Sequence, residues 1–303
     1  MNTLLEAMSG WPAQIADRLC VYQLPEREYR EYRQRVNMWH VKRFVDQFPK
    51  PIHDAAWAML EKFQLLDLYL LTSEWKSLPE EPKPIAVPLT ARHGESAQLM
   101  SYFISKRSVD VVSVEEAAGW RGPVWFFDDF LMSGKQARTS VQLMLGLEPD
   151  LPKERVSNPL SAGAVQWFRN ANITFRFACG TNDGRRSLCA VLKEAGVNAR
   201  VEIMHEARRL DAQTIGRTEQ QCQELCEFLR EVGYSLNQTN RSAIRDPQKW
   251  NADLCQQHAL GYGGMRLITA SFYGVPAATI TAVWKHGTYQ GKEWMPLLPR
   301  LAI

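Results

Sequence analysis

Two adjacent aspartates, Asp128 and Asp129, follow four apolar residues at 124–127 and precede a short Met-Ser-Gly stretch. The apolar run predicts a buried strand, which places both carboxylates at its carboxyl end. Carboxylates accept hydrogen bonds from vicinal hydroxyls and can help to hold a divalent cation. Ser133 and Gly134 stand where the next helix begins, and free backbone N–H groups at a helix start bind phosphate. The stretch therefore favours a ribose 5-phosphate; the alternative is a strand end whose solvated aspartates cap the next turn.

A second polar loop lies upstream of the acidic pair. Arg92, His93 and Gly94 follow a short apolar run at 85–89. Arg92 offers a charge to phosphate oxygens, and Gly94 lets the backbone approach a ligand. In open α/β sheets, ligands sit at the carboxyl ends of strands, which is where both loops fall. The alternative is a surface loop with incidental charge.

The middle of the chain alternates between short apolar runs and helix-like segments. This pattern predicts an α/β fold with a mainly parallel sheet and flanking helices. Asp183 is expected either to cap a helix or to contact a second substrate. The expected strands are 85–89, 109–114, 124–127, 173–178 and 197–204, and the expected helices are 96–106, 136–147, 183–195 and 210–232.

The first part of the chain has helical periodicity, including a run at 55–71, and a segment with two prolines at 80–84 predicts a boundary. The expected organisation is a helical N-terminal region, 1–80, and an α/β domain with a C-terminal extension, 81–303. Aromatic and basic residues interleave between Arg27 and Arg43. They favour an amphipathic helix with its aromatic rings in the core; the alternative is a nucleic-acid surface.

The composition is that of a globular protein able to bury a sizeable core. The chain has 303 residues, 45% of them hydrophobic, and a formal net charge of +3, which is too small to argue for nucleic-acid binding by itself. The scattered cysteines do not predict a metal site and suit a reducing compartment. Neither a signal peptide nor a run long enough to cross a membrane is visible, so we expect a cytoplasmic protein.

The stretch at 124–136 resembles the phosphoribosyl-pyrophosphate (PRPP) signature of type I phosphoribosyltransferases: four apolar residues, two acids, two apolar residues and a Ser/Thr-Gly loop. Met132 and Gln136 stand where that family usually has small hydroxyl residues. The loop at 92–96 resembles the family's pyrophosphate loop. The C-terminal part resembles a phosphoribosyltransferase-like family with a C-terminal extension found in bacterial anti-phage loci, through Gly261–Gly264, Val275–Pro276, Val283–Trp284 and Trp294–Arg300.

This resemblance implies a ligand, a chemistry and a context. Asp128 and Asp129 would hold the ribose hydroxyls, the loop would hold the 5-phosphate, and Arg92 with His93 and Gly94 would hold the pyrophosphate of PRPP. Mg²⁺ would arrive with PRPP or a ribosylated nucleotide rather than in a dedicated protein site, and an N-glycosidic bond would be made or broken. The loop residues implied are Ser133, Gly134, Lys135 and Gln136.

The implied context is an effector of anti-phage defence, in some members beside a retron reverse transcriptase and its msDNA. Such transferases often close a flexible loop over the site, and the segment 114–122 is the candidate here. Two alternatives stay open. One is a non-catalytic sensor of a phosphoribosyl ligand, and the other is a scaffold that binds a protein or nucleoprotein partner through the helical N-terminus.

Overall fold

A computed structural model describes residues 13–20, 36–67, 82–89, 96–105, 109–147, 159–239 and 251–299. The chain forms two compact units, one of residues 68–207 and one that joins residues 1–67 to residues 208–303. This grouping differs from the sequence-based division at residue 80, because the described N-terminal helices share one apolar core with residues that follow 208. Two segments far apart in the sequence thus complete a single core.

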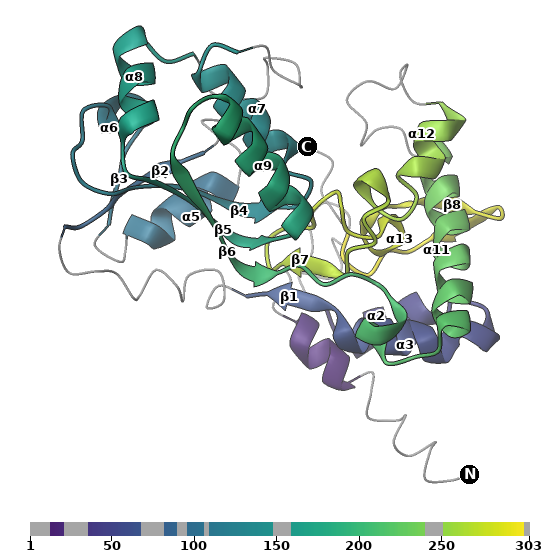
Figure 1. Ribbon diagram of the computed structural model, residues 1–303. Helices are drawn as coiled ribbons and strands as arrows, with labels where there is room; N and C mark the ends of the chain where they lie inside the picture. Colours follow the sequence, from purple (N-terminus) through teal and green to yellow (C-terminus); the bar gives the residue numbers. More distant parts are fainter. Residues whose placement is uncertain are drawn as a thin grey trace. The chain divides into compact units, whose positions relative to one another are not determined.

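The unit of residues 68–207 contains a parallel sheet of five strands (Figure 1). Its strands are β2 (Ile85–Pro88), β3 (Asp110–Val111), β4 (Val124–Leu131), β5 (Ile173–Gly180) and β6 (Ala199–Glu206). The spatial order is β3-β2-β4-β5-β6, so the connections turn back between β2 and β4. Numbered along the chain this is the doubly wound order 2-1-3-4-5, whose ligands bind at the carboxyl ends of the strands beside the point of reversal. The expected α/β class is confirmed.

Helices cover both faces of this sheet (Figure 1). They are α5 (Ser96–Ser105), α6 (Val114–Ala117), α7 (Lys135–Met144), α8 (Ala162–Asn170) and α9 (Asn182–Glu194). Apolar side chains of α6 to α9 pack with alternate strand residues such as Phe126 and Phe175 in one core. In α9 the buried residues Leu188, Val191 and Leu192 recur at helical spacing, which explains why this stretch folds as a helix on that face.

The other unit is mainly helical. Its elements are α2 (Met38–Val45), η1 (Lys50–Ile52), α3 (His53–Lys62), β1 (Gln64–Leu66), α10 (Ala212–Ile215), α11 (Glu219–Thr239), α12 (Ala252–Gln257), η5 (Tyr262–Gly264), β7 (Thr269–Ser271), α13 (Thr281–Trp284), β8 (Gly287–Tyr289) and β9 (Lys292–Trp294). The helix expected through residue 71 is wrong at its end, because α3 stops at Lys62 and β1 pairs in parallel with β7. The pairing of two distant segments overrides the local helical pattern.

Candidate functional site

The acidic pair lies inside strand β4 rather than after it. The strand was expected to end at Phe127, yet it runs on to Leu131. Its ladder with β2 ends at the pair Pro88 and Phe127, and the Leu89 amide donates to the Phe127 carbonyl at 3.0 Å. Beyond that point β4 continues beside β5 alone, because Phe130 still pairs with Cys179. The two aspartates therefore stand where β2 has ended, at the point where the sheet reverses.

Asp128 is buried, and its environment disfavours the charged form. Its side chain is 6% exposed. Burial raises the pKa of Asp128 well above its ordinary value, and the charge of Asp129 and a side-chain hydrogen bond with it raise this pKa further. One bond acts the other way, since the Asp129 amide donates to Asp128 Oδ1 at 2.9 Å. A ligand that brings hydroxyl donors or positive charge would relieve this cost.

Asp129 is half-buried, and its Oδ1 accepts from the Phe130 amide at 2.9 Å. Each carboxylate thus bonds the amide that follows it, which fixes both side chains against their own strand. Side chains held in this way are pre-organised, so a ligand binds without first ordering them.

A tight loop joins β4 to helix α7, and its conformation requires glycine. Gly134 has φ +71° and caps α7 with no side-chain hydrogen bond. A Cβ at this position would lie 2.7 Å from the Gly184 carbonyl oxygen. Ser133 Oγ accepts from the Lys135 amide at 3.4 Å. In the part of the chain that the structure describes, no protein group accepts from the amides of Gln136 and Ala137, so the start of this ten-residue helix offers donors to an anion.

The two departures from the phosphoribosyltransferase signature differ in position. The Met132 side chain is buried at 8% exposure, and its carbonyl accepts from Thr181. Gln136 is exposed in the first turn of α7. The methionine therefore serves the packing of the loop, and only the glutamine lies on the open side.

The structure brings Asp128, Asp129 and the loop residues through Gln136 together on one strand and the helix that follows it. Arg92, His93 and Gly94 fall outside the residues that the structure describes. The strand that leads to them, β2, ends beside Phe127, one residue before the acidic pair.

The segment 114–122, expected as a closing loop, is partly helical. Ser113 caps α6 in a capping box with Glu116, and Ala117 is fully buried in the core of the sheet. The Trp167 indole donates to the Trp120 carbonyl at 3.1 Å. These contacts hold the segment as part of the folded unit, so the expectation of a flexible loop is not met.

The sequence did not predict the residues of α9 that pack against the loop after β4. Thr181 and Gly184, at the start of α9, contact the carbonyls of Leu131 and Met132. The run of small residues after β5 was the available signal. Burial raises the pKa of the Cys179 thiol, near the end of that strand, to about 12, which disfavours the thiolate that a nucleophile requires.

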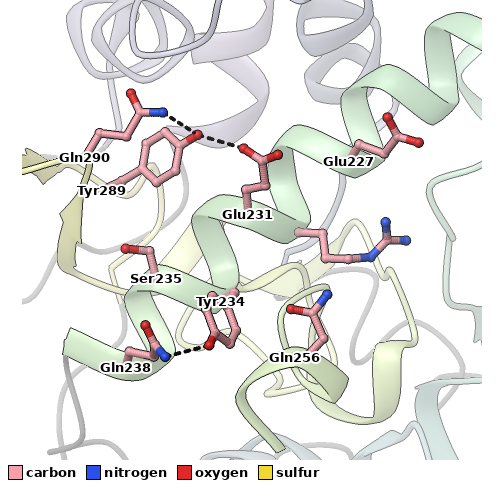
Figure 2. A pocket seen from close by; sticks show the side chains of 9 residues that line it. Glu227, Glu231, Tyr234, Ser235, Gln238, Gln256, Tyr289 and Gln290 are labelled. Atoms are coloured by element: carbon pink, nitrogen blue, oxygen red, sulfur yellow. Dashed lines mark hydrogen bonds between the residues drawn. The ribbon is translucent and has the colours of Figure 1, made fainter. Parts of the chain in front are cut away.

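The other unit holds a polar hollow of about 510 Å³ along α11 (Figure 2). Its lining residues bond to one another: Tyr289 Oη donates to Glu231 at 3.0 Å, and Gln290 donates to Tyr289 Oη at 3.1 Å. Gln238 donates to Tyr234 Oη at 2.7 Å. These polar groups form hydrogen bonds with one another, so the carboxyl end of strand β4 remains the better candidate site.

The described residues contain no group of three or more His, Cys, Asp or Glu side chains placed to hold a metal ion. None of the helices described combines the length and apolar character that crossing a membrane requires.

Comparison with protein families decides the relationship. The PRTase-CE family model matches residues 41–300. The chain belongs to the PRTase-CE family. This match supports a phosphoribosyltransferase-like family with a C-terminal extension. Comparison with the curated proteins gives no match.

The PRTase-CE match extends over the C-terminal motifs, and these serve packing. Trp294 is buried and donates from Nε1 to the Ala282 carbonyl at 2.7 Å. Leu297 and Leu298 belong to the same core. Gly261 lies so close to Ala278 that a Cβ would sit 2.2 Å from its carbonyl oxygen. The motifs that mark the C-terminal part of this PRTase-CE protein therefore maintain its fold.

Proposed function

We propose that the protein binds PRPP or a ribosylated nucleotide at the carboxyl end of β4 and makes or breaks an N-glycosidic bond. One observation carries this proposal: two adjacent carboxylates lie in one strand directly before a glycine-capped helix start. Ribose diols need acceptors and a 5-phosphate needs donors, and these two requirements meet within one strand-to-helix turn. Membership of a phosphoribosyltransferase-like family supports the same ligand class.

The roles proposed for the residues follow from their chemistry. Asp128 and Asp129 accept hydrogen bonds from the ribose 2- and 3-hydroxyls. The amides at the start of α7, with Ser133 and Lys135, hold the 5-phosphate. Arg92, with His93 and Gly94, neutralises the pyrophosphate, as the family pattern implies. Because the ribose is held at both ends, its anomeric carbon is presented to an acceptor in one orientation.

In transfer, the bond from the anomeric carbon to pyrophosphate breaks and a bond to an acceptor nitrogen forms. In cleavage, the bond to the nucleobase breaks and water supplies the new oxygen. Either path develops positive charge on the ribose ring, which the carboxylates beside it stabilise.

The residues present fit a magnesium ion that arrives with the ligand. Mg²⁺ prefers oxygen donors and is commonly held by one or two carboxylates together with substrate phosphates. Asp128 and Asp129 supply such carboxylates, and the burial and neighbouring charge that raise the pKa of Asp128 would be offset by a nearby cation, which supports this assignment. When bound, Mg²⁺ would neutralise the charge that builds up on the pyrophosphate.

Calorimetry with PRPP and Mg²⁺, beside a metabolite profile of expressing cells, tests the proposal. Wild-type protein should bind PRPP, and Asp129→Asn should weaken binding by about tenfold, the loss expected for a charge-assisted hydrogen bond. Glu194→Gln, which also removes one negative charge but lies exposed at the end of α9, is the matched control. Binding with a changed nucleotide pool supports the enzyme. Binding with no changed metabolite supports the sensor, and no binding overturns the ligand assignment.

We also propose that the protein acts as an effector in bacterial anti-phage defence, including systems with a retron reverse transcriptase and msDNA. Support comes from the resemblance of the C-terminal motifs. The test is a plaque assay with the native gene neighbourhood expressed. Asp128→Asn combined with Asp129→Asn should abolish protection with normal protein levels, and full protection by this variant would refute the role of the pocket.

A second candidate function, a partner-binding surface, is favoured by helix α2. Phe44 and Val45 are buried there, as an amphipathic helix predicts, but Met38 and Trp39 are 52% and 46% exposed. The Arg43 guanidinium lies 4.8 Å from the centre of the Trp39 ring. The expectation that the aromatic rings lie in the core therefore fails at Trp39, and an exposed aromatic beside a cation suits a protein or nucleoprotein partner.

The plaque assay distinguishes this candidate from the pocket. A variant with Met38→Ala and Trp39→Ala should keep PRPP affinity and thermal stability and lose protection. If protection is unchanged, this surface has no role in the defence phenotype.

A further inference from the structure

The loop after β4 is fastened to the start of helix α9 by one side chain. Thr181 is 3% exposed and caps α9. Its hydroxyl donates to the Met132 carbonyl at 2.6 Å and accepts from the Gly184 amide at 3.0 Å. Its own amide donates to the Leu131 carbonyl at 3.0 Å. Thr181 therefore holds two successive carbonyls, that of the last residue of β4 and that of the first residue of the loop.

Glycines let the loop and α9 approach this closely. A Cβ on Gly184 would lie 2.4 Å from the Leu131 oxygen and 2.5 Å from the Met132 oxygen. A Cβ on Gly180 would lie 2.8 Å from the Leu131 oxygen. Real side chains do not reach such separations, so the contact depends on residues without a Cβ. This close packing fixes the position of the loop against α9.

The direction of the loop carbonyls fixes the direction of the loop amides. A trans peptide is planar, and its C=O and N–H groups point opposite ways. The Leu131 and Met132 carbonyls point toward Thr181, so the amides of Met132 and Ser133 point away from α9. The Ser133 amide precedes the capping glycine of α7, and its orientation therefore sets one side of the anion-binding turn.

We propose that Thr181 is a positioning residue for the 5-phosphate loop. It holds the Leu131 and Met132 carbonyls against α9 so that the Ser133 amide and the start of α7 face the phosphate. This inference rests on the proposed ligand but concerns a residue on a different strand and helix. The hydroxyl is the essential group, because it bonds both the Met132 carbonyl of the loop and the Gly184 amide of the helix.

The test compares Thr181→Val, which removes the hydroxyl and keeps the shape, with Thr181→Ser, which keeps the hydroxyl. Calorimetry uses three probes: PRPP with Mg²⁺, ribose 5-phosphate, and pyrophosphate with Mg²⁺. Thr181→Val should weaken PRPP and ribose 5-phosphate by about tenfold and leave pyrophosphate unchanged, and Thr181→Ser should stay within about twofold of wild type. Thr174→Val, a buried threonine near the other end of β5, is the matched control and should bind as wild type.

Three results would overturn the proposal, because a general loss of structure explains each of them. They are that Thr181→Ser weakens binding as much as Thr181→Val, that Thr174→Val weakens it as much, and that Thr181→Val loses affinity for pyrophosphate. Hydrogen exchange of ligand-free protein separates this inference from the ligand assignment. In Thr181→Val the amide of residue 181, which in wild type donates to the Leu131 carbonyl, should exchange at least tenfold faster than in wild type. If wild type binds none of the probes, the ligand assignment fails, and unchanged exchange refutes the fastening itself. Thr181→Ala replaces the valine variant if that variant does not fold.

Discussion

Replacing Asp128 with asparagine should stabilise the protein at neutral pH and weaken ligand binding. Burial and the charge of Asp129 raise the pKa of Asp128 well above its ordinary value of 3.8, so the fold carries the cost of a buried carboxylate once that group ionises. Asparagine has no charge, and its side-chain oxygen can still accept from the Asp129 amide, which lies 2.9 Å from Oδ1 in the wild type. The perturbation therefore removes the charge and keeps the hydrogen bond.

The expected gain at pH 7 is about 1–2 kcal/mol of unfolding free energy, the usual effect of relieving one unfavourable functional-site group. Each kcal/mol corresponds to a Tm rise of about 2–4 °C. The gain should vanish below pH 3.8, where folded and unfolded chains both bind the proton. It should grow as pH rises from 3.8 through the folded-state pKa, because only the wild type must then keep a buried charge or a bound proton.

Thermal unfolding of wild type, Asp128→Asn and Asp129→Asn between pH 4 and pH 8 measures this difference. Asp129 is half-buried, so its asparagine variant is the matched control and should change Tm less. Both variants should bind PRPP more weakly than wild type. A Tm for Asp128→Asn at or below that of wild type at pH 7, or a gain that is as large at pH 4, would refute the reasoning.

Three further predictions concern groups away from the acidic pair. Thr139→Val should raise stability by about 1 kcal/mol in urea unfolding, because the fully buried Thr139 hydroxyl has no hydrogen-bond partner among the residues that the structure describes; a loss of stability would contradict this. Lys285 is buried and donates to Asn237, and burial lowers its pKa from 10.5 to about 8. Below pH 8, Lys285→Met should therefore gain at most about 3 kcal/mol of unfolding free energy, offset by about 1 kcal/mol for the lost hydrogen bond. This gain should shrink as the pH rises toward 10.5. Iodoacetamide at pH 8 should label exposed Cys189 and spare Cys179, whose pKa is about 12, and peptide mass spectrometry reads both sites; fast labelling of Cys179 would show that it is not buried.

Local sequence pattern predicted the elements that carry the site. Apolar runs placed the strands now seen as β2, β4, β5 and β6 within a few residues, because buried strands of a parallel sheet are apolar on both faces. The acidic pair and the Ser-Gly turn were likewise readable, since a carboxylate pair and a glycine at a helix start each have a chemical purpose. Alternation of strand and helix was sufficient to predict the α/β class.

Pattern failed where a distant partner decided the structure. The acids stopped the apolar run at Phe127, yet β4 continues to Leu131 because β5 offers a ladder partner as far as Gly180. The run at 64–66 reads as helix but pairs with β7, some two hundred residues later in the chain. Neither partner can be inferred from periodicity, which reports only neighbours along the chain.

By itself, the sequence determined which groups this protein brings to a ligand: two carboxylates, a glycine-capped helix start and the family to which the chain belongs. Only the tertiary structure decided the protonation of the carboxylates and the orientation of the loop. Burial beside Asp129 sets the proton affinity of Asp128, and packing of Thr181 and Gly184 against two carbonyls sets the direction of the loop. Both effects depend on what surrounds a group in space, and a parallel sheet joins residues that lie about fifty positions apart.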